Sequence, residues 1–172
     1  MNRRSFLLAS TGLIVGVHVS APAFAADKAG YEKLVKEVIG ALVAKNFADI
    51  DGLVTKLDAA AKIGVDLCKE VAASDAANKA IIEFAIANFE KIRATPTDKF
   101  EDEWHEGAAF KAAGHDNTKL DQTGKAASAI DAIIHPLTSR AALLAYKASK
   151  KPELIKTAID ELEEVLGHLK HL

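Results

Sequence analysis

The sequence predicts an all-α protein, an antiparallel bundle of four to five helices with an irregular insert around residues 97–123. Apolar residues recur at intervals of three and four along most of the chain, as one face of a helix requires. No stretch shows the strict alternation of polar and apolar residues that is typical of a half-buried strand. Because long helices with short connections pack as antiparallel neighbours, this pattern favours a bundle.

The first two expected helices are separated by residues 46–49. The first spans residues 31–45, and Asp49 or Asp51 caps the second, because a carboxylate accepts hydrogen bonds from the free N–H groups of a first helical turn. Cys68 falls on the apolar face of this second helix, far from its start. We therefore expect a buried thiol that packs as a small apolar group.

A third helix is expected after Ser74 or Asp75, either of which is a suitable cap. Its apolar face runs from Ile81 to Ile92. It ends at Thr95-Pro96, because proline has no N–H and restricts the residue before it.

The last two helices follow the insert. One starts at Thr123 and contains His135-Pro136, so it is either kinked or two helices placed end to end. Pro152 suits the first turn of the final helix, where its missing N–H costs nothing. The apolar face of that helix consists of Ile155, Ala158, Ile159, Leu162, Val165 or Leu166, and Leu169.

Residues 1–25 have the order of a cleaved export leader. Arg3 and Arg4 precede an apolar run, and Ala23-Phe24-Ala25 offers small residues where a signal peptidase reads them. The run is too short and Gly-rich for a membrane span, which needs roughly 20 apolar residues. We therefore expect cleavage after Ala25, a single domain at 26–172 without a membrane span, and a place in the bacterial periplasm.

The start of this leader, Asn2 to Leu8, resembles the twin-arginine export motif, in which an arginine pair precedes a spacer, a Phe and a Leu. It departs from the motif at Asn2, where Ser or Thr is usual, and at Leu8, where Lys is frequent. Substrates of that route cross the membrane folded, often with a cofactor already bound. An arginine pair also occurs in Sec leaders, so both routes remain open.

Composition excludes several classes of site. The net charge of −2 becomes more negative without Arg3 and Arg4, which argues against nucleic-acid binding. A single Cys excludes c-type haem, iron–sulfur clusters and Cys-based zinc sites. Since Met1 leaves with the leader, a metal would be held by His, Asp and Glu, and a haem would need histidine ligands and no covalent attachment.

The densest group of such residues is Glu101-Asp102-Glu103-Trp104-His105-Glu106. On an α-helix, His105 shares a face with Glu101 and Asp102, which suits either a divalent metal or a more basic imidazole. The alternative is a solvated acidic helix start with Trp104 in the core.

Further candidates lie on both sides of the expected helix break. His115 and Asp116 sit in a predicted loop, where they either complete a site with His105 or form a turn. His135 lies beside the apolar stripe, either as a ligand or as a core-edge residue bonded to Asp131 or to a carbonyl freed by Pro136. The candidate metal ligands are thus Glu101, Asp102, His105, Glu106, His115, Asp116 and His135.

The last helix carries Glu161, Glu164, His168 and His171 along one face. Two histidines at this spacing can share a metal. The end of a chain tends to fray, however, and histidine near a helix C-terminus is favourable through the helix dipole alone. These observations favour an exposed, structural role for this face.

Three functions remain open. The first is a periplasmic protein that binds a divalent metal or a non-covalent haem through His and carboxylate residues. The second is a scaffold protein of the cell envelope that binds a protein partner through a groove near Phe100, Trp104 and Phe110. The third is an enzyme with His105 as acid or base, which the absence of HExxH, GxSxG and Gly-rich phosphate loops disfavours. The sequence does not indicate an oligomeric state.

Overall fold

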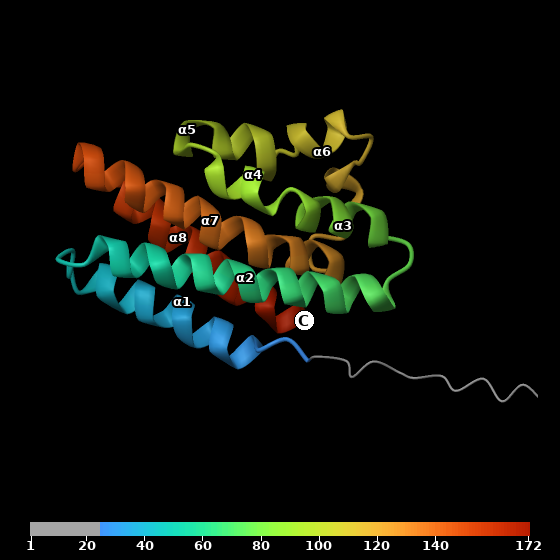
Figure 1. Ribbon diagram of the computed structural model, residues 1–172, viewed down its shortest axis with the longest axis horizontal. Helices are drawn as coiled ribbons and strands as arrows, with labels where there is room; N and C mark the ends of the chain where they lie inside the picture. The colour runs from blue at the N-terminus through green and yellow to red at the C-terminus, as the bar shows by residue number, and fades with distance from the viewer. Residues whose placement is uncertain (1–24) are drawn as a thin grey trace, which may run out of the picture.

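Helix is the only regular secondary structure in residues 25–172, the part of the chain that the computed structural model describes. The predicted leader, apart from Ala25, lies outside these residues. Four long helices pack side by side (Figure 1): α1 (Lys28–Val43), α2 (Ile50–Ser74), α7 (Lys125–Ser149) and α8 (Glu153–His168). Helices α1 and α7 each contact both α2 and α8. The predicted all-α fold is therefore confirmed for this part of the chain.

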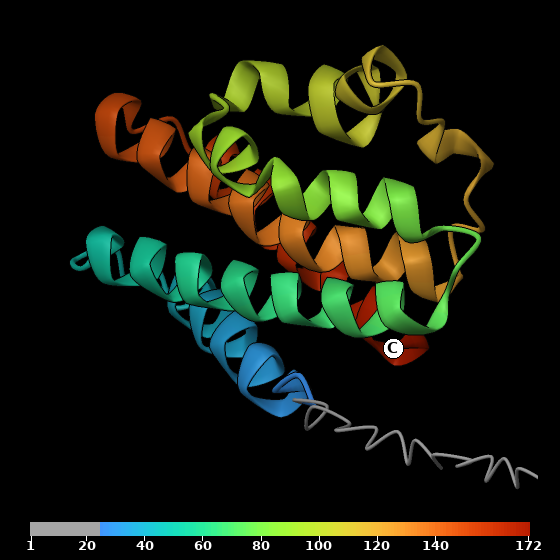
Figure 2. The same cartoon turned by 45° about the vertical axis from the view of Figure 1, so that its right-hand side comes forward.

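The remaining segments are short helices on the α2 and α7 side of the molecule (Figure 2). In chain order they are α3 (Lys79–Ala87), α4 (Phe89–Ala94), α5 (Thr97–Phe100), a π-helical turn (Glu101–His105), α6 (Ala108–Ala112) and a 3₁₀ turn (Asn117–Lys119). A last 3₁₀ turn (Leu169–His171) follows α8. None of the helices of residues 25–172 has the length and apolar character needed to cross a lipid bilayer.

The helix expected after Ser74 differs from the prediction. Ser74 ends α2, and Asp75 holds the following turn by accepting a hydrogen bond from the Asn78 N–H at 3.1 Å. The expected helix is then divided at Asn88, whose side-chain amide donates to the Phe84 carbonyl at 2.8 Å. Short polar side chains compete for backbone groups in this way and interrupt helices. The described residues consequently form more helices than the predicted four to five.

Two apolar clusters share α7. One lies among the four long helices and includes Val35, Leu57 and Leu162, all fully buried. The other lies between α2, α7 and the short helices and includes Ile82, Trp104 and Leu137. Because α7 is covered on both sides, polar groups on it are removed from water and need partners.

Helix α7 continues through Pro136 as one helix, so Pro136 does not divide it in two. Proline at this position leaves the carbonyl of Ala132 without its usual N–H donor. The hydroxyl of Tyr31, fully buried on α1, donates to that carbonyl at 3.0 Å. The carbonyl freed by the proline is therefore bonded by Tyr31 rather than by His135.

The same turn of α7 lies against α2. A Cβ atom added at Gly64 would stand 2.2 Å from the Ala132 carbonyl oxygen, so only glycine permits this approach. One turn along, the Cys68 thiol contacts the Ala129 carbonyl at 3.0 Å, and burial raises the pKa of this thiol. Cys68 is fully buried, as predicted.

We expect Gly64→Ala to destabilise the protein by about 1–3 kcal/mol, because the added methyl group forces α2 and α7 apart. Gly40→Ala on α1 is the matched control, since no neighbouring heavy atom lies within 4 Å of its added Cβ. That control should stabilise the helix by about 0.5–1 kcal/mol. Urea unfolding measures both, and equal effects of the two variants would contradict the close approach.

Candidate metal centre

A π-helical turn positions His105. The Glu106 N–H donates to the Glu101 carbonyl five residues back, at 2.9 Å. The turn is anchored by Trp104, which is fully buried and donates from its indole N–H to the Thr95 hydroxyl at 2.9 Å. Single π turns occur frequently at functional sites, because they rotate side chains away from the α-helical positions. Here the turn directs His105 toward α7 and α8.

The segment after His105 is held by Gly107 and Asn117. Gly107 has a φ of +77°, a conformation that other residues rarely adopt, and an added Cβ would collide with the Asn117 side chain at 1.9 Å. The Asn117 amide donates to the His105 carbonyl at 3.3 Å. The loop after α6 thus fixes the backbone that carries His105.

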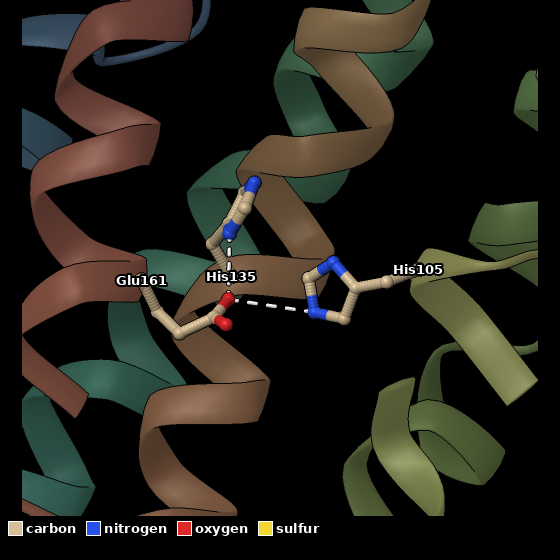
Figure 3. Close-up of side chains that lie close together, drawn as sticks. All are labelled: His105, His135 and Glu161. Atoms are coloured by element: carbon tan, nitrogen blue, oxygen red, sulfur yellow. Dashed lines mark hydrogen bonds and ion pairs between the residues drawn. The ribbon is translucent and has the colours of Figure 1, made fainter. Parts of the chain in front are cut away.

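Three side chains from different segments converge beside this turn (Figure 3). Nδ1 of His135 on α7 lies 2.7 Å from Oε2 of Glu161 on α8, and Nε2 of His105 lies 3.4 Å from the same oxygen. One ligand atom from each residue lies within 4.8 Å of the other two. All three side chains are largely buried, with exposed fractions of 17% or less. The arrangement brings two imidazole nitrogens to one carboxylate oxygen.

The proton of His105 is placed by Thr138. The Thr138 hydroxyl donates to the Ile134 carbonyl at 3.0 Å and therefore accepts from Nε2–H of His105, at 2.9 Å. His105 then carries its proton on Nε2. To ligate a metal through Nε2, its proton must move to Nδ1 and the bond to Thr138 must be given up.

A second group lies next to the first and shares His135. Ligand atoms of Asp131, His135 and His168 lie within 4.8 Å of one another. Nδ1 of His168 lies 3.4 Å from Oδ2 of Asp131, yet this nitrogen is buried and has no hydrogen-bond partner. A cavity of about 200 Å³ adjoins the group, and its lining includes Asp131, His135, Glu164 and His168.

Burial favours the uncharged forms of these groups. It lowers the pKa of His135 to about 4. It also raises the pKa of Asp131 to about 7, and the negative charges of Glu164 and Glu161 contribute to this increase. Burial likewise lowers the pKa of His105 and raises the pKa of Glu161. The attraction between these two side chains partly offsets both shifts. A neutral imidazole has a free lone pair, the form that binds metals. A bound cation would stabilise the charged forms of the carboxylates, because its positive charge would lie beside them.

Of the predicted ligands, the structure brings His105 and His135 together, with ring centroids 5.1 Å apart. It leaves Glu101, Asp102 and Glu106 exposed and outside both groups. The predicted shared face assumed α-helical spacing, which the π turn does not have. The carboxylate at His105 comes instead from Glu161 on α8.

His115 and Asp116 also lie outside both groups. The His115 ring packs on Phe84, with centroids 5.2 Å apart. The Asp116 carboxylate accepts from the Thr118 N–H at 3.2 Å and caps the 3₁₀ turn, and hydrogen bonds from Thr118 lower its pKa. Asp116 thus forms the turn that was the alternative to a ligand.

The exposure expected for this face of the last helix is wrong for Glu161 and His168. Their side chains are 14% and 23% exposed, because the end of α8 packs against α7 instead of fraying. The spacing of Glu161, Glu164 and His168 already indicated that these possible ligands share one face of the helix, but the sequence does not show which helix covers this face. His171 is exposed, as expected.

No protein-family model, curated protein or solved structure matches this chain. A functional assignment therefore depends on the chemistry of these side chains. Imidazole nitrogens with carboxylate oxygens suit zinc, copper, nickel and iron, whereas calcium and magnesium prefer oxygen ligands alone. The cavity of about 200 Å³ is smaller than the roughly 300–1,000 Å³ pockets that hold drug-sized molecules.

The three aromatic residues near which a groove for a protein partner was expected are buried and do not form an exposed groove. Trp104 and Phe110 are fully buried and Phe100 is 1% exposed. Trp104 and Phe110 pack edge to face with ring centroids 5.9 Å apart, as core aromatic pairs do. These residues support the position of His105 rather than offer a surface.

We expect Asp131→Asn to stabilise the metal-free protein, and increasingly so at higher pH. Its folded-state pKa of about 7 exceeds the unfolded value of about 3.9, so the folded protein retains a proton that the unfolded chain releases. The stability that this group contributes is complete below about pH 4 and is lost as the pH rises to about 7. The amide avoids this loss, a gain of roughly 3–4 kcal/mol at pH 8.

Urea unfolding in EDTA at pH 5 and pH 8 measures this difference. The control is Asp102→Asn, which removes an exposed carboxylate near the same site and should not change the pH dependence. A wild-type protein and an Asp131→Asn variant with the same pH dependence would contradict the interpretation.

Proposed function

We propose that this chain is an exported helical-bundle protein of the bacterial periplasm that binds a divalent transition metal. The ligands are Nε2 of His105, Nδ1 of His135 and a carboxylate oxygen of Glu161. The observation that carries the proposal is the convergence of both nitrogens on one buried oxygen, at 3.4 and 2.7 Å. Buried polar groups of this kind are retained where they have partners or bind ions.

The spacing suits a small ion after minor adjustment. Ligands about 2.0–2.1 Å from a tetrahedral zinc ion are about 3.3 Å from one another. The 2.7 Å contact between His135 and Glu161 is a hydrogen bond, which an ion would replace. In the bound form the His135 proton would leave Nδ1 and the His105 proton would leave Nε2, so each imidazole presents a lone pair to the metal.

A metal with two His and one carboxylate ligand keeps at least one coordination position free. The same ligand set occurs in zinc sites that activate a water molecule and in iron sites that bind oxygen. The ligand types suit zinc, copper, nickel and iron. The supply of each metal in the cell and the coordination geometry of the site then determine which ion is bound.

The fold at the start of the described chain is compatible with cleavage after Ala25. The backbone N of Ala26 lies 3.2 Å from Oε2 of Glu70 on α2. Cleavage after Ala25 would convert this amide into a terminal ammonium group beside a carboxylate. The resulting ion pair would hold the new N-terminus against α2, where a charged end is compatible with the fold.

Calorimetry of chelator-treated protein should show about one Zn²⁺ or Cu²⁺ bound per chain at the first position, the site formed by His105, His135 and Glu161. Glu161→Gln and His105→Gln should each weaken this binding about 100-fold or more, because even residues that only orient metal ligands contribute 10–100-fold. The control is Glu163→Gln, an exposed neighbour on the same helix, which should bind like the wild type. Circular dichroism shows whether each variant remains folded.

Metal analysis of protein purified from the periplasm without added metal provides the complementary test. A folded protein that contains almost no zinc, copper, nickel or iron, and that binds none when titrated, would exclude the proposed function. Equal affinity in the wild type and in Glu161→Gln would place the ion elsewhere.

Mass spectrometry of the exported protein should give an N-terminus at Ala26. Glu70→Gln should then lower the stability of the cleaved protein by up to about 1 kcal/mol, since the pair is exposed. The same substitution should have a smaller effect on the uncleaved chain, where Ala26 has an uncharged amide. A mature N-terminus elsewhere, or a chain that stays in the cytosol with its leader, would contradict this prediction.

A further inference from the structure

We propose that the centre holds two metal ions, with His135 as the bridge: the second ion is bound by Asp131, His135 and His168 and faces the cavity. This inference rests on the proposed function at the first position and extends it. The first ion would lie among His105, His135 and Glu161, and the second would be accessible to water or a small ligand.

The two triads lie side by side along α7 and α8. Asp131 precedes His135 by one turn of α7, and His168 follows Glu161 by about two turns of α8. Because α8 returns along α7 after a short connection, later positions on α8 lie beside earlier positions on α7. Asp131 and His168 therefore meet farther from the α7–α8 connection than His135 and Glu161 do. His135 belongs to both groups.

The imidazole of His135 can serve both positions. Its Nδ1 lies 2.7 Å from Glu161, and Figure 3 shows the other ring nitrogen pointing away from Glu161. A ring that ligates one metal through each nitrogen is an imidazolate, so its single N–H proton is released to solvent when both ions are bound. No oxidant or reductant is involved, and the positive charge of the second ion compensates the negative ring.

One ligand atom of the second position lacks a hydrogen-bond partner. The Nδ1 atom of His168 is buried without a hydrogen-bond partner, although Oδ2 of Asp131 is only 3.4 Å away. A cation between these two atoms would give both of them a partner. The His168 ring lies beside the His135 ring, with centroids 5.5 Å apart and planes at 21°.

The surroundings of the second position favour an open coordination sphere. The cavity of about 200 Å³ is lined by all three ligands of the second position, Asp131, His135 and His168. Of the first position, His105 and His135 line it and Glu161 does not. The amide side chains of Asn117 and Gln122 also line it and offer hydrogen bonds to a metal-bound water. Glu164, whose carboxylate lies 3.9 Å from His135 Nδ1, adds negative charge at the rim.

Metal stoichiometry tests the bridge. Chelator-treated wild-type protein, titrated with Cu²⁺ and freed of excess ion, should retain two ions per chain. Two Cu²⁺ ions joined by an imidazolate couple magnetically, so the electron paramagnetic resonance signal per copper should be weaker than that of isolated ions. Asp131→Asn and His168→Gln should each retain one ion and restore the uncoupled signal.

The outcomes separate this inference from the proposed function. One ion in the wild type, unaffected by Asp131→Asn but lost in Glu161→Gln, would overturn the second position and leave the first. One ion that is lost in Asp131→Asn and kept in Glu161→Gln would overturn the first position and the two-ion centre, and would place the single ion at the second position. A folded protein that binds no ion would overturn both positions. Glu163→Gln is the charge-matched control on α8 and should retain two ions. Circular dichroism of every variant shows whether a lost ion reflects the ligand or the fold.

Discussion

The carbonyl of Ala132 is the point on which the rest of the structure depends. Pro136 deprives it of a helical donor, Tyr31 supplies one from α1, and Gly64 lets the backbone of α2 approach it. These contacts unite α1, α2 and α7 around one turn. They allow α7 to continue through a proline, and so they fix Asp131 and His135, one turn apart on the same face of α7, in a defined relation to α8.

Burial of the candidate centre follows from this packing. Helix α7 is covered on both sides, so the polar groups on its α8 face lose their water. In that environment His135 becomes a neutral imidazole and Asp131 resists ionisation. Carboxyl groups and unprotonated imidazoles gathered out of water are costly unless a cation or a complete hydrogen-bond network compensates them. The unpartnered nitrogen of His168 shows that the network is incomplete.

Local features of this fold could be predicted from the sequence. Helical periodicity identified the long helices, and Asp49 caps α2 as its position suggested, accepting from the Gly52 N–H at 2.8 Å. His105 and His135 could be chosen because few residue types can ligate a metal. Glu161 and His168 could not, since their burial depends on how the end of α8 packs on α7. The π turn was equally inaccessible, because it arises from the anchoring of Trp104 rather than from a sequence pattern.

The origin of the ligands bears on how binding and folding are connected. His105 comes from the irregular segment, His135 from α7 and Glu161 from α8, so an ion would join parts of the chain that are distant in sequence. Without an ion these atoms form hydrogen bonds with one another and with Thr138. Metal binding would exchange those bonds for stronger ligand bonds at nearly the same positions. The segment that carries His105 would then gain stability beyond that supplied by its buried aromatic residues and by the hydrogen bonds from Trp104 and Asn117.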